Sequence, residues 1–313
     1  MIDRPYVTVV GSVHTDLIAS AVTMPTPGSS VIGNRFTLAP GGKAGNQAAQ
    51  LARLGVPTVL ISRIGRDPLG NVIAGQLAAS GVDLSFLARP EDAVTGASTV
   101  FAVGGEYASI IVPGAAAGLT DTHLAAAEVV FRRSRFVLAQ LELGTKLAIA
   151  AFIRARDAGA TTVMNASPIQ DVDPDALAEV LDLTDVLVVN RHEAAVLIAA
   201  PISDRADATL VSARLNERFG LGATVITCGA EGMVLARGSQ VIEQAAWPIE
   251  VVDTVGAGDA FLGALIAAWQ RGDDDRASLR YGAAAGALAA SAAGAFTSLP
   301  NRAEVYDFLR SRG

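Results

Sequence analysis

Short runs rich in β-branched residues alternate with longer stretches rich in Ala and Leu along most of this chain. Because strands are shorter than helices, the alternation predicts an α/β protein with a parallel sheet and helices on both faces. Ligands of such sheets bind beyond the carboxyl ends of the strands. The predicted strands are residues 6–10, 58–62, 136–139, 161–164, 186–189 and 224–227. The predicted helices are residues 45–54, 69–80, 146–157, 174–181, 191–198 and 206–219.

Two segments interrupt this alternation and predict a small second sheet. Residues 16–38 contain turn residues and a run rich in Val, Phe and Thr. Residues 98–113 are typical of a β-hairpin with Gly104, Gly105 and Glu106 at its turn. The pattern leaves open whether this sheet covers an active site as a lid or is a surface excursion. Since we find no linker, repeat or low-complexity tract, residues 1–313 are predicted to form one domain with a β insertion.

Composition argues against several classes of protein. Of the 313 residues 51% are hydrophobic, yet no apolar run reaches the roughly 18 residues of a membrane span. The stretch that comes nearest, residues 282–296, consists of small residues and predicts a tightly packed internal helix. One cysteine, Cys228, excludes a disulfide framework, and the first residues lack a secretory signal, so we expect a cytoplasmic protein. The net charge of −7 argues against nucleic-acid binding.

The feature with the clearest chemistry is the segment of residues 251–264, VVDTVGAGDAFLGA. Gly256, Ala257 and Gly258 let backbone amides converge, and the apolar helix that follows adds the positive end of its dipole. This pattern predicts an anion hole for a transferring phosphoryl group. Asp259 lies in the first turn, close enough to accept a proton from an attacking hydroxyl. The alternative is an ordinary loop with Asp259 as a helix cap.

A second glycine-rich segment, residues 41–48 (GGKAGNQA), opens another predicted helix. Its amide donors, together with Lys43 and Asn46, suit a polyhydroxylated ligand, and a loop with a solvated lysine is the alternative. Neither segment matches G-x-x-x-x-G-K-[ST] or G-x-G-x-x-G, which argues against a P-loop enzyme and an NAD-dependent enzyme.

With both segments in this order and separation, the sequence resembles the ribokinase family of carbohydrate kinases. The resemblance runs nearly end to end, through GSVHTD (11–16), LE (141–142), NASP (165–168), NRHE (190–193), TCG (227–229) and GAFTSLP (294–300). It implies a three-layer α/β/α sandwich with a central, mostly parallel sheet and a small β-sheet lid made of residues 16–38 and 98–113. It also implies an ATP-dependent sugar kinase.

The resemblance assigns the catalytic roles to the segment of residues 251–264. It makes Asp259 the base that orients the attacking hydroxymethyl oxygen, with Gly256, Ala257 and Gly258 as the anion hole. In a loose transition state the proton moves late, so positioning and electrostatics supply most of the acceleration. The sugar-binding positions of the family correspond here to His14, Asp16, Gly42, Lys43, Asn46 and Glu142.

The resemblance also implies nucleotide and metal sites. Asn190 and Glu193 match the family's Asn-x-x-Glu motif, which organises Mg²⁺ and phosphate through waters. Thr227 and Gly229 match the loop that lies along ATP, and Gly232 shapes the next turn. A monovalent cation, usually K⁺, is implied beside the anion hole at a set of positions: Asp253, Val255, Ala292, Gly294 and Ser298.

Three positions depart from the family's pattern. His14 stands where ribokinases usually have Asn beside the sugar, and Ala116 replaces the Asn of a Gly-Ala-Asn-Ala turn. Ala283 stands where His or Asn often lies near the adenine. Of the three, His14 bears on the identity of the sugar, because an imidazole is bulkier and can titrate.

The expected reaction is transfer of the γ-phosphate of ATP to the 5-hydroxyl of D-ribose. The alternatives within the family are deoxyribose, another pentose, a ketohexose or a nucleoside as acceptor. A non-catalytic nucleotide- or sugar-binding regulator is the alternative from another class. The family often pairs its lids, so we expect a homodimer formed through the β lid. The expected ligands are a small sugar and ATP. We expect no binding to nucleic acid or to a membrane.

Overall fold

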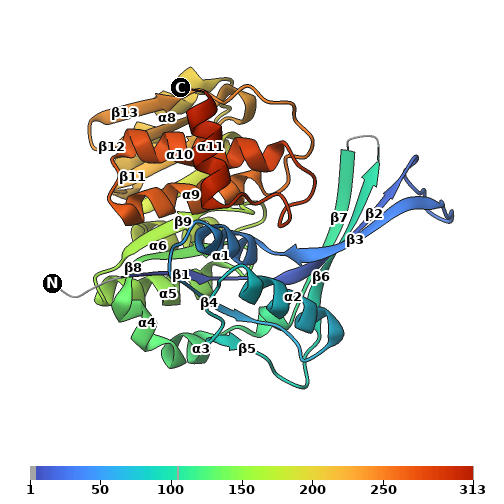
Figure 1. The fold of residues 1–313 in the computed structure, drawn as a ribbon. Coiled ribbons are helices and arrows are strands. Elements are labelled where there is room, and N and C mark those ends of the chain that lie inside the picture. Colours follow the sequence, from blue (N-terminus) through green and yellow to red (C-terminus); the bar gives the residue numbers. More distant parts are fainter. Residues whose placement is uncertain (1–4, 104–105, 313) are drawn as a thin grey trace.

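The computed structural model describes residues 5–103 and 106–312, and a nine-stranded sheet forms its centre (Figure 1). The strand order is β13-β12-β11-β10-β9-β8-β1-β4-β5. Neighbours from β11 to β5 are parallel, and β12 and β13 extend the sheet with antiparallel pairing. The strands are β1 (Tyr6–Val10), β4 (Thr58–Arg63), β5 (Leu87–Ala88), β8 (Ser134–Gln140), β9 (Thr161–Asn165), β10 (Val186–Asn190), β11 (Ala223–Thr227), β12 (Met233–Arg237) and β13 (Gln240–Gln244).

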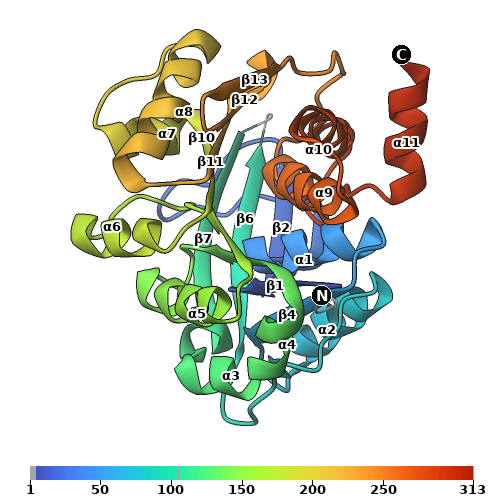
Figure 2. The same cartoon turned by 90° about the vertical axis from the view of Figure 1, so that its left-hand side faces the viewer.

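Helices cover both faces of this sheet (Figure 2). One face carries α1 (Lys43–Arg53), α2 (Pro68–Ala79), α9 (Ala257–Arg271), α10 (Asp275–Ala290) and α11 (Arg302–Ser311). The other carries α3 (Asp121–Ala126), α4 (Glu128–Arg133), α5 (Thr145–Asp157), α6 (Pro174–Asp182), α7 (Arg191–Ile198) and α8 (Arg205–Phe219). Two short 3-10 helices span Ala115–Gly118 and Gly229–Glu231. The predicted three-layer α/β/α sandwich is confirmed.

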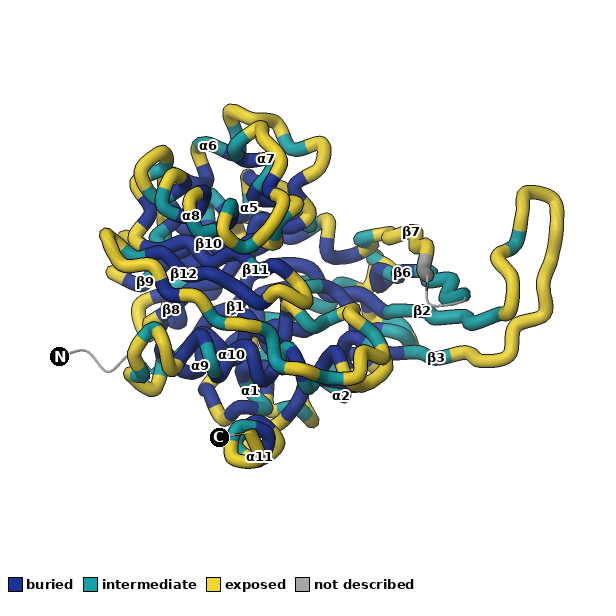
Figure 3. Tube along the Cα trace, turned by 90° about the horizontal axis from the view of Figure 1, so that it is seen from above, coloured by how far each residue is buried: buried dark blue, intermediate teal, exposed yellow. Residues whose placement is uncertain are grey.

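Each face of the sheet has its own hydrophobic core, because successive strand side chains point to opposite faces. In β1, Val9 packs with the cluster that includes α1 and α9, and Val10 packs with the cluster that includes α5. Leu60 and Ile61 of β4 divide in the same way. Figure 3 shows the buried residues gathered along these strands and the exposed ones on the outer loops and helices. Burial on both faces explains why the strands are continuous apolar runs in the sequence.

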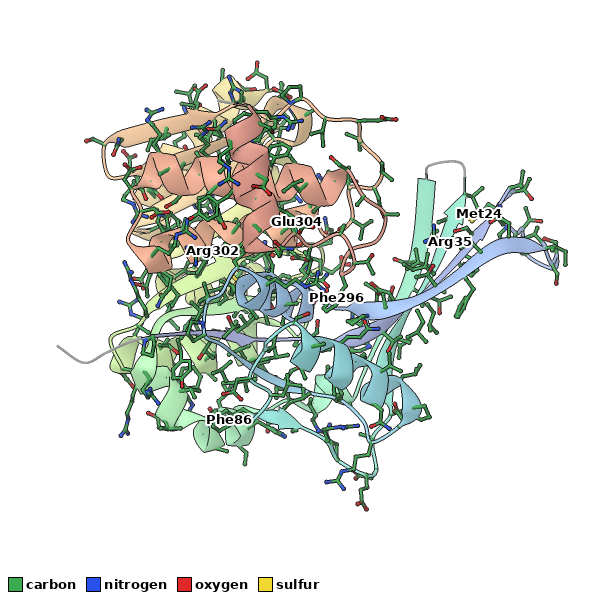
Figure 4. The ribbon with its side chains drawn as sticks, viewed as in Figure 1. Met24, Arg35, Phe86, Phe296, Arg302 and Glu304 are labelled. Carbon is green, nitrogen blue, oxygen red and sulfur yellow. The ribbon has the colours of Figure 1, made fainter. Side chains whose placement is uncertain are left out.

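A second, four-stranded sheet projects from the main body, with the order β3-β2-β6-β7 (Figure 1). Its strands are β2 (His14–Ala21), β3 (Gly33–Gly41), β6 (Thr95–Val103) and β7 (Glu106–Gly114). Met24 and Arg35 lie on its projecting part, away from the helices (Figure 4). At the other end, β1 leads into β2 and β3 leads into α1. The predicted turn residues Gly104 and Gly105 lie outside the described residues, as do residues 1–4.

Two parts of the chain differ from prediction. Within residues 282–296, helix α10 ends at Ala290, whose carbonyl accepts hydrogen bonds from Val252 N–H at 2.9 Å and Asp253 N–H at 3.2 Å instead of continuing the helix. The sheet is also extended by the antiparallel pair β12–β13, which the alternating pattern did not predict. In the part of the chain that the structure describes, no helix is both long enough and apolar enough to cross a bilayer.

Candidate active site

A cleft of about 330 Å³ lies at the carboxyl ends of β9, β10 and β11, where the start of α9 faces them. This is the edge of the sheet at which ligands are expected. The predicted site residues that line it are Lys43, Asn190, Glu193, Thr227, Val255, Gly256, Gly258 and Asp259. The rest of the lining comes from Asn165, Ser167, Val188, Val189, Thr254 and Phe261.

The N-terminus of α9 opens toward this cleft. Its cap is Gly256, which has a φ of 80°, and a Cβ at this position would lie 2.7 Å from the backbone of Ala295. Only glycine fits this conformation and this close approach. An added Cβ at Gly258 would meet nothing within 4 Å, so the helix start is open on that side. Ala257 N–H donates to Thr254 O at 3.2 Å and closes the turn before the helix.

Asp259 is held in one orientation by two amide side chains from α1. Asn46 Nδ2 donates to Asp259 Oδ2 at 3.0 Å, and Gln47 Nε2 donates to Asp259 Oδ1 at 2.9 Å. The Asp259 side chain lines the cleft, although the residue is only 7% exposed. Each carboxylate oxygen can accept more than one hydrogen bond, so Asp259 can still accept one from a hydroxyl in the cleft.

Several predicted sugar-binding residues converge at the start of α1. Glu142 Oε2 accepts hydrogen bonds from Lys43 N–H at 2.9 Å and from the Ser12 hydroxyl. A Cβ at Gly41 would lie 2.4 Å from Asp16 Oδ1, so the absence of a side chain lets the Asp16 carboxylate approach the backbone. Two carboxylates and a lysine backbone amide are thus brought together beside the residues that hold Asp259.

His14 contacts one of these carboxylates. Its Nε2 lies 3.3 Å from Asp16 Oδ1, and the residue is 4% exposed. In β2 it pairs in register with Gly41. The next residue, Gly42, caps α1 with a φ of 86°, and a Cβ there would come 2.6 Å from Ser12 O. His14 therefore alters the hydrogen-bonding surface that Asp16 offers to a ligand.

On another wall of the cleft, Asn190 and Glu193 form a capping box at the start of α7. Asn190 Oδ1 accepts from Glu193 N–H at 2.8 Å, and Glu193 Oε2 accepts from Asn190 N–H at 2.8 Å. The reciprocal bonds fix both side chains where they line the cleft. Glu193 is 5% exposed, so its carboxylate faces the cleft from a largely buried position.

Beyond β11 the chain turns sharply. Thr227 lines the cleft, and Gly229 and Gly232 have φ values of 58° and 102°. A Cβ at Gly232 would lie 2.1 Å from Gln244 O, so this turn requires glycine. Burial raises the pKa of the Cys228 thiol. A thiol with a raised pKa has little thiolate, so Cys228 is a packed residue rather than a nucleophile.

Asp253 connects the loop before α9 to the loop after α10. Its Oδ1 accepts from Val255 N–H at 3.0 Å, and its Oδ2 accepts from Gly294 N–H at 2.9 Å. Gly294 O accepts from Ser298 N–H at 3.2 Å, and Ala292 lies in the same loop. The predicted cation-site residues therefore lie on two loops that Asp253 joins.

Sequence reasoning assigned no role to a group of buried amides beside Asp259. Gln47 Nε2 also donates to Asn165 Oδ1 at 3.0 Å, and Gln140 Nε2 donates to Gln47 Oε1 at 2.6 Å. A glutamine on the buried side of an Ala-rich helix is the signal that could have identified Gln47. The family's polar positions at Ala116 and Ala283 are filled here by alanines that are 1% and 4% exposed.

Comparisons with known proteins identify the family of this chain. A family model described as pfkB family carbohydrate kinase matches residues 4–302. A ribokinase of Haemophilus influenzae is 29% identical over 307 residues, which are 98% of this chain and 99% of the relative. The structure of Arabidopsis thaliana ribokinase complexed with ribose and ATP has a TM-score of 0.87 and 28% identity, with 98% and 99% of the two chains covered. The structure of a putative ribokinase II from E. coli with ATP and Mg²⁺ has a TM-score of 0.83 and 25% identity, with 97% and 99% covered. This chain belongs to the pfkB family of carbohydrate kinases and is an ATP-dependent carbohydrate kinase.

Proposed function

We propose that this kinase transfers the γ-phosphate of ATP to the 5-hydroxyl of D-ribose, with Asp259 as the base. The observation that carries the proposal is the Asp259 carboxylate, which lines the cleft beside Gly258 and is fixed by Asn46 and Gln47. A base must lie within hydrogen-bonding reach of the hydroxyl that it activates. The ribokinase relatives support ribose as the acceptor.

In this mechanism the 5-hydroxyl donates a hydrogen bond to Asp259, which directs the hydroxyl oxygen toward the γ-phosphorus. The new O–P bond forms as the bond from phosphorus to the bridging oxygen of ADP breaks, and the proton passes to the carboxylate. Because the transition state is loose, the proton moves late and a weak base suffices. The amides of Gly256 and Gly258, with the α9 dipole, counter the charge on the phosphoryl oxygens, and the Ala257 N–H joins them only when it leaves Thr254 O.

The other hydroxyls of the acceptor need partners that both donate and accept. Asn46 Oδ1 is buried and has no hydrogen-bond partner among the described residues. An unpaired buried carbonyl oxygen is costly, so a sugar hydroxyl is a suitable donor to it. We propose that the acceptor is bound by His14, Asp16, Gly42, Lys43, Asn46 and Glu142.

For the nucleotide, we propose that Thr227, Gly229 and Gly232 shape the loop along ATP. Asn190 and Glu193 fit a site for Mg²⁺, because this ion keeps several waters and needs few protein ligands. Such an ion neutralises charge on phosphate oxygens when it is bound. In this chain, Glu193 offers the carboxylate and the capping box keeps it facing the cleft.

We also propose a K⁺ site beside the anion hole. The oxygen donors available there are the Asp253 carboxylate and backbone carbonyls of the two loops that it joins, a set that suits a hard cation. When bound, the ion would add positive charge next to the helix start. The positions that hold it would be Asp253, Val255, Ala292, Gly294 and Ser298.

We further propose that residues 1–313 form one domain, with residues 16–38 and 98–113 as its lid, and that two lids pair in a homodimer. A lid that closes over the acceptor excludes water and so limits ATP hydrolysis. Side chains alternate along β2, so Asp16 and Leu17 lie on opposite faces of the second sheet. Phe36 and Ile110, each 67% exposed, are on the Leu17 face by register. Exposed apolar side chains gathered on one face favour a subunit contact.

The test is ADP release by the purified protein with Mg²⁺-ATP and K⁺. The acceptors to compare are ribose, deoxyribose, other pentoses, fructose and nucleosides. We expect the highest kcat/KM with ribose. Asp259→Asn keeps the side-chain shape but removes the proton acceptor, so kcat should fall about 10²- to 10⁴-fold while ATP binding persists.

Each other result has a distinct meaning. A higher kcat/KM with another acceptor keeps the mechanism and changes the substrate. Wild-type turnover by Asp259→Asn contradicts the assignment of the base. If the wild type binds ATP by calorimetry but releases no ADP with any acceptor, a non-catalytic regulator becomes the better description.

A further inference from the structure

We infer that Gln47 is a positioning residue for the proposed base, and this inference rests on the assignment of Asp259 as that base. Gln47 is 0% exposed and is not among the residues that line the cleft. Its side chain therefore reaches Asp259 from the interior of the protein, and it does not touch a ligand in the cleft.

The direction of the Gln47 amide is determined by its neighbours. Asn165 Nδ2 donates to Val188 O at 3.1 Å, and a backbone carbonyl only accepts, so Asn165 Oδ1 must face Gln47. That oxygen needs a donor, which is Gln47 Nε2 at 3.0 Å. The same nitrogen has a second hydrogen, and this one is donated to Asp259 Oδ1 at 2.9 Å. A reversed Gln47 amide would place three oxygens against one another.

Gln140 holds the other end of this amide. Its Nε2 donates to Gln47 Oε1 at 2.6 Å. Gln140 ends β8 and pairs in register with Asn165, which ends β9. A Cβ at Gly11 would lie 2.2 Å from Gln140 Oε1, so the glycine makes room for this side chain. The ends of two neighbouring strands thus fix Gln47, and Gln47 transmits their position to the base.

This arrangement restricts the carboxylate in a way that Asn46 alone does not. With Asn46 on Oδ2 and Gln47 on Oδ1, rotation of the Asp259 carboxylate breaks a buried hydrogen bond. Asn46 is also a proposed contact of the acceptor, whereas Gln47 is not a proposed contact of either substrate. Misplacing a reacting group by about 1 Å can lower a rate about 100-fold. Loss of Gln47 should therefore lower kcat and leave the binding of both substrates nearly unchanged.

The chain offers a matched control on the same helix. Gln50 lies one turn after Gln47, is also 0% exposed, and donates its Nε2 to Pro300 O at 3.0 Å. We expect Gln47→Met to lower kcat roughly 10- to 100-fold, with both KM values within about threefold of wild type. Gln50→Met loses one buried hydrogen bond where Gln47→Met loses three, so its thermal unfolding midpoint should also fall, but by less, while kcat stays within about threefold of wild type.

Two further variants make the test decisive. Gln47→Glu keeps the size of the side chain but removes the donor, so the same fall in kcat is expected. In the Asp259→Asn background, Gln47→Met should lower the residual kcat no further, because the two residues act through one group.

A wild-type kcat in folded Gln47→Met or Gln47→Glu overturns the inference, as does an equal fall in kcat in Gln47→Met and Gln50→Met. If Asp259→Asn keeps wild-type turnover, the base assignment itself fails. If Gln47→Met keeps the wild-type kcat while Asp259→Asn loses it, the base assignment stands and the positioning role of Gln47 fails.

Discussion

His14 and Asp16 are close to each other on β2, with 3.3 Å between His14 Nε2 and Asp16 Oδ1. In the proposed site this contact occupies an oxygen that a sugar hydroxyl would otherwise use. We expect His14→Asn to raise kcat/KM for D-ribose relative to the other acceptors by about 2- to 10-fold, the effect of one hydrogen bond. The measurement is the same acceptor panel, with KM for ATP as the internal control. An unchanged ranking of acceptors would show that His14 does not select the sugar.

At the scale of single residues, the sequence predicted the parts of the site that are contiguous. Asp259 follows its glycines directly, so the motif itself marks the start of the helix. The hydrogen-bond network of Gln47 was not predictable in this way, because Gln47 lies 118 positions from Asn165 and 93 from Gln140. No local pattern links residues that only the sheet brings together.

At the scale of elements, Asp67 joins helix α2 to strand β6. Its Oδ1 accepts from Gly70 N–H at 2.8 Å as the helix cap, and its Oδ2 accepts from Thr95 N–H at 2.7 Å. Burial raises the pKa of this carboxyl, but the hydrogen bonds from Thr95 and Gly70 outweigh that effect and the pKa is lowered. The stabilisation that ionised Asp67 gives to the fold is therefore complete at pH values above the ordinary Asp pKa of about 3.9. This stabilisation is lost as the pH falls through the lowered pKa of the folded state.

Asp67→Asn tests this contact, because asparagine is also a good helix cap but offers one acceptor oxygen fewer. We expect the wild type to be more stable by about 1 kcal/mol at pH 7 and the difference to shrink below about pH 3.9. Urea unfolding of both proteins between pH 7 and pH 3 measures it. Asp173, whose side chain caps α6 through Ala176 N–H, is the control, and Asp173→Asn should change stability less. A difference at Asp67 that is independent of pH would contradict the role of the charge.

The order of strands and helices was largely predictable, and the misses have physical causes. The β12–β13 pair is joined at Gly238, which has a φ of 55°, and short strands on either side of such a glycine are a recognisable hairpin signal. The end of α10 was not predictable from its small residues. There the carbonyl of Ala290 accepts hydrogen bonds from the N–H groups of Val252 and Asp253, which lie far earlier in the chain.

At the scale of the whole molecule, the exposed apolar row on the second sheet carries the prediction of a dimer. Light scattering at micromolar concentration should give the mass of two chains. Charges at Phe36 and Ile110 would have to be buried in the contact, so Phe36→Asp with Ile110→Asp should give one chain. Val129→Asp, at a side chain that is 58% exposed on α4, should leave the dimer intact. A wild-type mass of one chain would contradict the proposal.

The strands of the second sheet enter the acceptor site without a break. The strand that carries His14 and Asp16 continues outward to Ala21, and the strand that ends at Gly41 is followed directly by Gly42 and α1. Part of the proposed acceptor site is therefore built on the projecting sheet. If a second subunit holds that sheet, acceptor binding and subunit association are thermodynamically linked, and each changes the other's equilibrium constant by the same factor. The apparent affinity of the enzyme for its acceptor then depends on the enzyme concentration.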